Sequence, residues 1–168
     1  SDPQLDSLRI PPHSIEAEQS VIGGLLRDNA AYDRIADFMH AEDFYRYDHR
    51  IIFEQIVKMV NASKPADVIT VFETLTQLGK AEDVGGLAYL NAMAQNTPSA
   101  ANIRRYAEIV RDRGVPRKLI TVADDISGTA FSPQGKEVKQ MLDEAESKIF
   151  AIAEEGARGA QGWTAIQP

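Results

Sequence analysis

The chain has 168 residues, of which 43% are hydrophobic, so it can bury a core and is not disordered throughout. Its net charge of −7, from 18 basic and 25 acidic side chains, is opposite in sign to that of a typical free-standing nucleic-acid-binding protein. The absence of cysteine excludes disulfides, thiolate zinc sites and a Cys nucleophile, and no run of 18 apolar residues predicts a membrane span. Because the chain starts without Met and stops at "TAIQP", we expect a piece of a longer protein.

The first two thirds of the chain predict a compact bundle of short helices. Residues 1–12 form a polar segment ending in Pro11-Pro12, and we expect a disordered tail there. The apolar periodicity then predicts helices at about 14–26, 30–39, 48–62, 68–78 and 86–95, with N-caps at Asn29 and Asp67. The β-branched run "VITVF" is an alternative strand, although no neighbouring segment alternates in a way that would pair with it. The predicted helical head covers residues 13–98.

The remainder predicts a long antiparallel helical hairpin over residues 99–155. Thr97 is the expected N-cap of its first arm, with Pro98 at the first helical position. Pro116 predicts either one helix kinked there or two abutting helices. The second arm covers about 135–155, and the glycine-rich residues 156–168 predict the start of an interdomain linker. The predicted fold class is therefore all-α, a compact bundle of short helices followed by the hairpin.

The hairpin carries more apolar surface than two helices can bury against each other. The second arm has a narrow apolar stripe, close to the seam of a coiled coil. Two helices cannot bury both sides of such a seam, so we expect a partner, most simply another copy of the chain. The residues predicted for this oligomer interface are Leu119, Val122, Ile126, Met141, Leu142, Ala145 and Ile149.

Motifs for chemistry are absent or incomplete. The segment "GTAFSPQGKE" departs from a P-loop, because six residues separate its glycines and Glu137 stands where Ser or Thr must bind magnesium. The acidic cluster around His49, from Asp43 onward, is an alternative metal or acid–base site, but helix capping and packing explain it better. We therefore predict no catalytic, cofactor or metal site in this chain.

Arginines concentrate in the first arm of the hairpin, between Arg104 and Arg113. Glu108 lies four residues after Arg104 and three before Arg111, so part of this charge is paired locally. A solvated helix face is the favoured interpretation, followed by a protein-docking face. The third is a single-stranded nucleic-acid-binding module using residues 104–118, which needs several unpaired cations on one surface.

Four blocks resemble the N-terminal domain of bacterial replicative DNA helicases of the DnaB type, in that family's order and spacing. They are "PPHSIEAEQSVIGGLL" (11–26), "DFYRYDHRIIF" (43–53), "VGGLAYL" (84–90) and "NTPSAANIRRYAEIVRDR" (96–113). The resemblance covers residues 9–155. It implies a helical head and hairpin that form a collar on a ring hexamer, in a bacterial cytoplasmic protein associated with the nucleoid and the replisome.

The same resemblance implies partners and an absent motor. Hairpins pair between subunits as dimers or within the hexamer. The collar binds primase, and helicase loaders or phage proteins also engage the helicase. DNA is contacted mainly by an absent domain, a five-prime to three-prime motor that uses ATP and Mg. The docking residues that we predict on this basis are Arg111, Arg113, Arg117, Lys118, Glu144 and Lys148. One departure from the family pattern is "GVP", where Gly114 and Pro116 are expected to bend the first arm.

Overall fold

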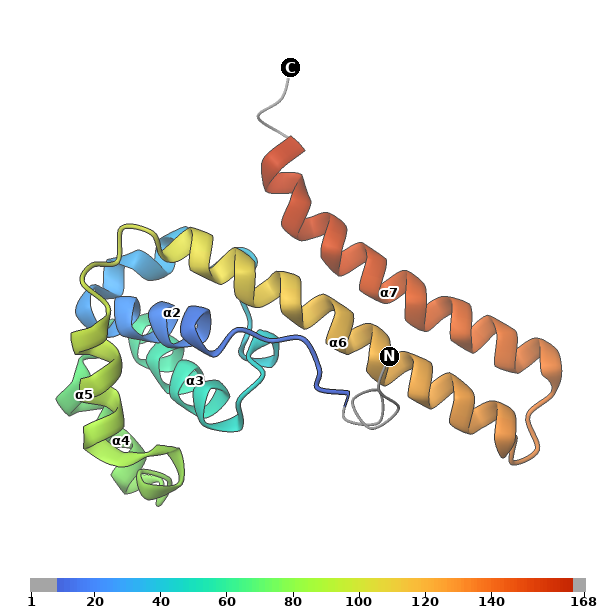
Figure 1. Ribbon diagram of the computed structural model, residues 1–168, viewed down its shortest axis with the longest axis horizontal. Helices are drawn as coiled ribbons and strands as arrows, with labels where there is room; N and C mark the ends of the chain where they lie inside the picture. The colour runs from blue at the N-terminus through green and yellow to red at the C-terminus, as the bar shows by residue number, and fades with distance from the viewer. Residues whose placement is uncertain (1–8, 165–168) are drawn as a thin grey trace. The chain divides into compact units, whose positions relative to one another are not determined.

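The computed structural model describes residues 9–164, with side chains up to residue 156. All regular elements within this range are helices (Figure 1). The chain divides into two compact units, a head of His13–Gly114 and a hairpin unit of Ser1–Pro12 with Val115–Pro168. The all-α prediction is confirmed for the described residues.

The head contains four α-helices and three short 3₁₀ helices, and it also takes in the first part of α6. In chain order its elements are α2 (Ile15–Arg27), η1 (Asn29–Arg34), η2 (Ala41–Asp43), α3 (Tyr47–Asn61), α4 (Val68–Gln77), η3 (Glu82–Val84) and α5 (Gly86–Asn96). Ser14 caps α2 by accepting a hydrogen bond from the N–H of Ala17, and Asp67 caps α4 through the N–H of Thr70. The predicted cap at Asp67 is therefore confirmed, and "VITVF" is helical.

The core of the head is built from one face of each helix. Helix α2 packs against both α3 and α5, and α4 packs against α3 and α5. Fully buried side chains include Ile22, Leu25, Ile52 and Leu90. Burial of this apolar surface is the main force that holds the short helices together, because helices this short are marginal alone.

Helix α6 (Ile103–Phe131) belongs to both units. Its first part buries Ile103, Ala107 and Val110 in the head core. The boundary between the units consequently lies after residue 114, whereas the sequence placed it after residue 98. Pro116 lies inside this single helix, so the alternative of two abutting helices is wrong.

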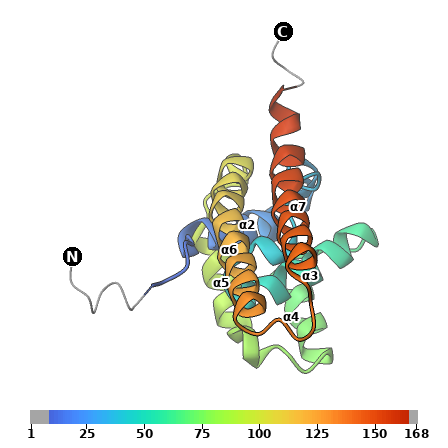
Figure 2. The ribbon, with the colours of Figure 1, turned by 90° about the vertical axis from the view of Figure 1, so that its right-hand side faces the viewer.

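The hairpin consists of residues 115–131 of α6, a turn, and α7 (Val138–Thr164). The two arms run side by side in opposite directions (Figures 1 and 2). The turn uses left-handed backbone at Gln134 and Gly135, with φ of 50° and 84°. Backbone helix continues to Thr164, beyond the predicted end at residue 155, so residues 156–164 of the predicted linker are helical. The rest of that linker, residues 165–168, and residues 1–8 of the predicted tail lie outside the described residues.

Two further local predictions are wrong. The segment predicted as a helix at 30–39 is a 3₁₀ helix that ends at Arg34, and its cap is Asp28. Asn29 instead bridges two segments, since its amide donates to the carbonyls of Leu25 and Ala66. Thr97 ends α5 rather than starting α6, because its side chain is buried against the backbone of Gly23.

Candidate assembly surface on the helical hairpin

The two arms of the hairpin meet along a thin apolar seam. Ile126 on α6 lines one groove with Met141 and Ala145 on α7, and these three side chains and Val122 on α6 are half-buried. Within residues 115–156, no side chain is buried to the degree seen in the head core. Residues 115–156 of the hairpin unit therefore form a seam without an enclosed core.

One flank of the seam is apolar and open. Leu119 on α6 is 46% exposed, and Leu142 and Ile149 on α7 are 65% and 48% exposed. Val138 adds to the same side of α7, since it lies four residues before Leu142. All seven residues predicted for the oligomer interface thus lie on the hairpin, four in its seam and three on this open flank.

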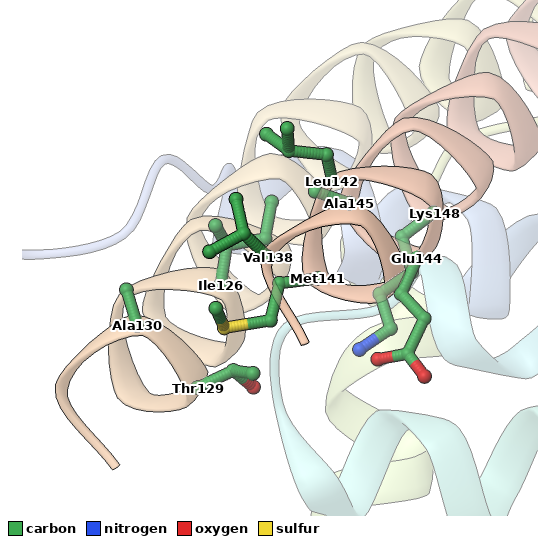
Figure 3. Close-up of a pocket in the computed structure, with 9 residues that line it drawn as sticks. All are labelled: Ile126, Thr129, Ala130, Val138, Met141, Leu142, Glu144, Ala145 and Lys148. Carbon is green, nitrogen blue, oxygen red and sulfur yellow. The ribbon is translucent and has the colours of Figure 1, made fainter. Parts of the chain in front are cut away.

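A groove opens near the turn, where seam and open flank meet (Figure 3). Its volume is about 180 Å³. The apolar side chains of Ile126, Val138, Met141 and Leu142 line much of it, and Glu144 and Lys148 also belong to its lining (Figure 3). A hollow lined by apolar groups on an exposed surface has the chemistry of a protein-docking site.

The other flank of the seam is held by ion pairs, which we call the charged clasp. Lys118 on α6 lies 2.7 Å from Glu155 on α7. Asp125 on α6 pairs with Lys148 on α7, and Lys136 in the turn lies 2.8 Å from Glu144. The hydrogen bond from Lys148 lowers the pKa of Asp125, and that from Lys136 lowers the pKa of Glu144. The charged clasp leaves the opposite, apolar flank as the available surface.

Each of the six predicted docking residues is engaged within the chain. Arg111 donates to the carbonyl oxygen of Phe38 at 2.6 Å, and Arg113 donates to that of His13 at 3.1 Å. Arg117 donates to the carbonyl of Pro12 at 2.7 Å. Lys118, Glu144 and Lys148 belong to the charged clasp. Arg111 and Arg113 lie in the head, and the other four lie in the hairpin unit.

The remaining arginines of the first arm are also used internally. Arg104 donates to the carbonyl of Arg34 at 2.9 Å, stands over the ring of Phe38, and forms the predicted pair with Glu108 at 3.6 Å. Arg105 is the second partner of Glu108, at 3.5 Å. The guanidinium groups of Arg104 and Arg111 thus bind carbonyl oxygens at the last residue of η1 and in the segment after it, where a helical segment leaves acceptors unpaired.

Comparisons with known proteins fit this arrangement. A family model described as "DnaB-like helicase N terminal domain" matches residues 10–112, more than half of the chain. The chain belongs to this family. It is 47% identical over 153 residues to the replicative DNA helicase DnaB of Pasteurella multocida, covering 91% of this chain and 33% of the relative. The DnaB helicase of Geobacillus stearothermophilus is 38% identical over 157 residues, covering 94% of this chain and 34% of the relative.

Solved structures support the DnaB-type fold. The crystal structure of the N-terminal domain of DnaB helicase from Mycobacterium tuberculosis superposes with a TM-score of 0.81 at 30% identity, covering 84% of this chain and 99% of that one. A DnaB-like replicative helicase, studied with its interactions with primase, superposes with a TM-score of 0.65 at 20% identity over 83% of this chain and 31% of that one. The second likeness shows the fold alone. This DnaB-type chain spans about a third of the length of the curated relatives that it matches.

The region matched by the DnaB-type family model carries a buried polar network that sequence reasoning missed. Glu18 is on the apolar face of α2, and its carboxylate accepts hydrogen bonds from the backbone N–H groups of Tyr45 and Arg46. His49 lies between Glu18 and the hydroxyl of Tyr89, at 2.8 Å and 2.6 Å. The available signal was a charged residue in register with Val21, Ile22 and Leu25.

This network accounts for the cluster that was considered as a metal or acid–base site. His49 is fully buried and both of its ring nitrogens have partners. Asp43 accepts from the backbone N–H of His40 at 2.8 Å and so closes the turn at η2. Across the described part of the chain, no group of three His, Cys, Asp or Glu side chains is arranged to hold a metal ion. None of the described helices has the length and apolarity to cross a bilayer.

Sequence reasoning also missed apolar side chains on the hairpin. Phe131 at the end of α6 is 89% exposed, and Ile120 and Phe150 are exposed on the two arms. Ile120 and Phe150 could have been identified from the sequence, because they are apolar residues out of phase with the apolar period of the seam.

Proposed function

We propose that this chain is an assembly and docking module of a replicative DNA helicase, and that its open apolar flank pairs with a second copy. The observation that carries the proposal is the exposure of Leu119, Leu142 and Ile149 along one flank of a hairpin without an enclosed core. Contiguous apolar surface of this kind is the usual sign of a protein interface in a water-soluble chain. Pairing through one flank gives an isologous, two-fold contact.

Family membership supports the wider setting. The whole protein would be an ATP-dependent five-prime to three-prime helicase that needs Mg, with the motor outside this chain. It would act as a hexamer with a collar made from these domains, in bacterial cytoplasmic DNA replication. DNA would be contacted mainly by the motor. The segment "GTAFSPQGKE" departs from a P-loop, so the residues that bind ATP and Mg would belong to the motor.

Primase is the proposed partner of the assembled module, and helicase loaders or phage proteins are further candidates. Support comes from family membership and from the DnaB-like helicase studied with primase. The six predicted docking residues already hold contacts within the chain, so a partner has to bind over these pairs or exchange with them. Calorimetry with the C-terminal domain of the cognate primase tests this part. The absence of heat and of co-elution would contradict it.

Self-association is tested by sedimentation velocity over a range of concentrations. We expect the wild-type chain to associate and Leu142→Asp to remain monomeric, because a carboxylate on the open flank must lose water on pairing. Ser147→Asp is the matched control, since it adds the same group at an exposed position of α7 away from the seam. A wild-type chain that stays monomeric at the highest concentration, or a Leu142→Asp chain that associates normally, would overturn the pairing.

A further inference from the structure

Two of the three ion pairs of the clasp join the two arms, and within these two pairs the charges alternate in sign along the hairpin. Lys118 faces Glu155, and seven positions further along α6, Asp125 faces Lys148. Each arm therefore presents one cation and one anion, spaced by one heptad, and the order is reversed between the arms. The two pairs lie on the same flank of the seam, with side chains between 26% and 52% exposed.

The apolar residues of the seam and the open flank select a register only weakly, because most of them recur at heptad spacing; Met141, seven positions before Lys148, is an exception. On α7, Ala145 is followed seven positions later by Ile152, and Leu142 by Ile149. On α6, Leu119 and Ile126 have the same spacing. A shift of one arm by a heptad therefore places apolar groups opposite apolar groups again, as in any coiled coil with a regular repeat.

Two glycines beside the turn give the backbone between the arms conformational freedom. When one arm slips by seven residues against the other, the centre of the turn moves along the sequence by half that number of residues. Gly128 and Gly135 flank this region, and a Cβ added at either glycine meets no atom within 4 Å. Because glycine adopts both helical and left-handed backbone, the last turn of α6 can rewind into a different turn.

The clasp charges, by contrast, distinguish the registers. A slip by one heptad in one direction brings Lys118 opposite Lys148. The same slip in the other direction brings Asp125 opposite Glu155. Like charges that are forced together are unfavourable in either case. We propose that the charged clasp is a register lock, which fixes the α6–α7 pairing by penalising both one-heptad slips.

The lock acts mainly through the slipped states that it excludes. Exposed ion pairs of this kind stabilise a native state only slightly, so the native pairs alone would not hold the register firmly. Like charges meet in both slipped registers, and their repulsion increases the free-energy difference between the native and the slipped states. Polar residues act in the same way in coiled coils that select one partner or register. The register in turn decides which side chains of α7 meet Ile126 and Ala130 around the groove. This inference does not depend on the proposed pairing of copies.

Charge swaps distinguish the effect of the native ion pairs from the effect of the alternating charges on the slipped registers. The first variant exchanges one pair, Lys118→Glu with Glu155→Lys, and the second exchanges the other, Asp125→Lys with Lys148→Asp. Each keeps two opposite-charge pairs in the native register, but both slips then also bring opposite charges together. The variant with all four substitutions restores the alternation, and with it the like-charge contacts in the slipped registers.

Pulsed electron paramagnetic resonance reads the register directly. The chain has no cysteine, so Thr121→Cys and Gln140→Cys, both exposed, place one spin label on each arm at different heights. Dilution with unlabelled chain removes distances between copies. A heptad at 1.5 Å per residue displaces α7 by about 10 Å, so a slipped population adds a second, well-separated distance.

We expect one distance for the wild-type charges and for the fourfold variant, and two distances for each single-pair swap. Loss of helical circular dichroism in both single-pair swaps with recovery in the fourfold variant also supports the lock, because all these chains have two native-register pairs. A single, unchanged distance in all four chains would overturn it. Two distances in the fourfold variant would overturn it as well.

Discussion

The imidazole Nδ1 of His49 lies 2.8 Å from the carboxylate of Glu18, and both side chains are at most 1% exposed. When the Nδ1–H donates to Glu18, the Nε2 of His49 accepts from the hydroxyl of Tyr89. The hydroxyl oxygen of Tyr89 in turn accepts from the amide of Gln19 at 3.1 Å. This chain of hydrogen bonds connects α2, α3 and α5, so the head has a polar tie within its apolar core.

Removal of the Glu18 carboxylate should destabilise the head strongly. Glu18→Ala leaves His49 and the N–H groups of Tyr45 and Arg46 without their acceptor, and each unpaired buried donor costs about 1–3 kcal/mol. We expect a loss of at least about 3 kcal/mol in the free energy of unfolding, measured by urea denaturation and circular dichroism. Glu16→Ala, at an exposed position of the same helix, is the control. Equal midpoints for the two variants would show that the network contributes nothing.

The hydroxyl of Tyr89 should make stability depend on pH in the alkaline range. Burial raises the pKa of Tyr89 above its ordinary value of about 10. Because the folded state favours the protonated phenol, this stabilisation is complete below the unfolded pKa and is lost as pH rises through the folded one. Tyr89→Phe should be less stable than wild type by about 1 kcal/mol at neutral pH, with a difference that narrows above about pH 10. Urea midpoints at pH 7 and above pH 10 check this, and a constant difference would contradict it.

Gly23 should tolerate no side chain. A Cβ at this position would lie 2.3 Å from both the carbonyl oxygen of Met93 and the hydroxyl of Thr97. Gly23→Ala therefore forces α2 and α5 apart, and we expect a loss of about 1–3 kcal/mol, as for other overpacked cores. Gly128→Ala is the matched control in an exposed helix, where nothing lies within 4 Å of the new Cβ and helix propensity favours Ala by about 1 kcal/mol. Thermal or urea unfolding of the two variants should move in opposite directions.

The predictable parts of the fold are those decided by local patterns. Apolar spacing and caps located α2, α3, α4 and α7 to within a few residues at their starts, because amphipathic faces and Asp67 act within one helical turn. The apolar stripe of the hairpin follows the same rule, whereas Ile120, Phe131 and Phe150 were missed. A local sequence pattern therefore predicts well which side of a single helix is apolar.

The parts that were predicted wrongly depend on contacts between distant segments. Thr97 has the chemistry of an N-cap, but close packing against Gly23 takes its side chain into the core. Asn29 has the same chemistry and instead bridges to Ala66. The spacing of the α6 arginines favours a solvated helix face, whereas Arg111 reaches the carbonyl of Phe38, 73 positions away in the sequence. No local spacing encodes such pairs.

Replacement of Pro116 should stabilise α6. A proline inside a helix lacks the N–H for one backbone hydrogen bond and crowds the preceding turn, and it costs up to about 3 kcal/mol relative to alanine. We expect Pro116→Ala to raise the unfolding midpoint. Pro133→Ala, in the exposed turn between the arms, is the control and should give no increase, because proline there restricts the unfolded chain at no cost to a helix. Similar midpoints for both variants would mean that α6 accommodates Pro116 without strain.

The arginines of α6 should matter more for stability than for nucleic acid. Arg111→Ala removes a charged donor from the carbonyl of Phe38, and we expect a loss of about 1.5–3 kcal/mol. Arg105→Ala is the control, because Arg105 is 67% exposed and pairs only with Glu108 among the ion pairs observed, and its loss should cost less than about 1 kcal/mol.

The same two variants test the alternative of a nucleic-acid-binding module over residues 104–118. Phosphate binding requires cationic side chains that are free to displace the counterions condensed on DNA, and here Arg104, Arg111 and Arg117 already donate to backbone carbonyls. We expect no measurable fluorescence-anisotropy change with labelled single-stranded DNA at low salt for wild type or either variant. Binding by wild type that falls steeply with salt and is weakened by Arg105→Ala, without loss of stability, would instead favour a DNA-contacting role for this helix.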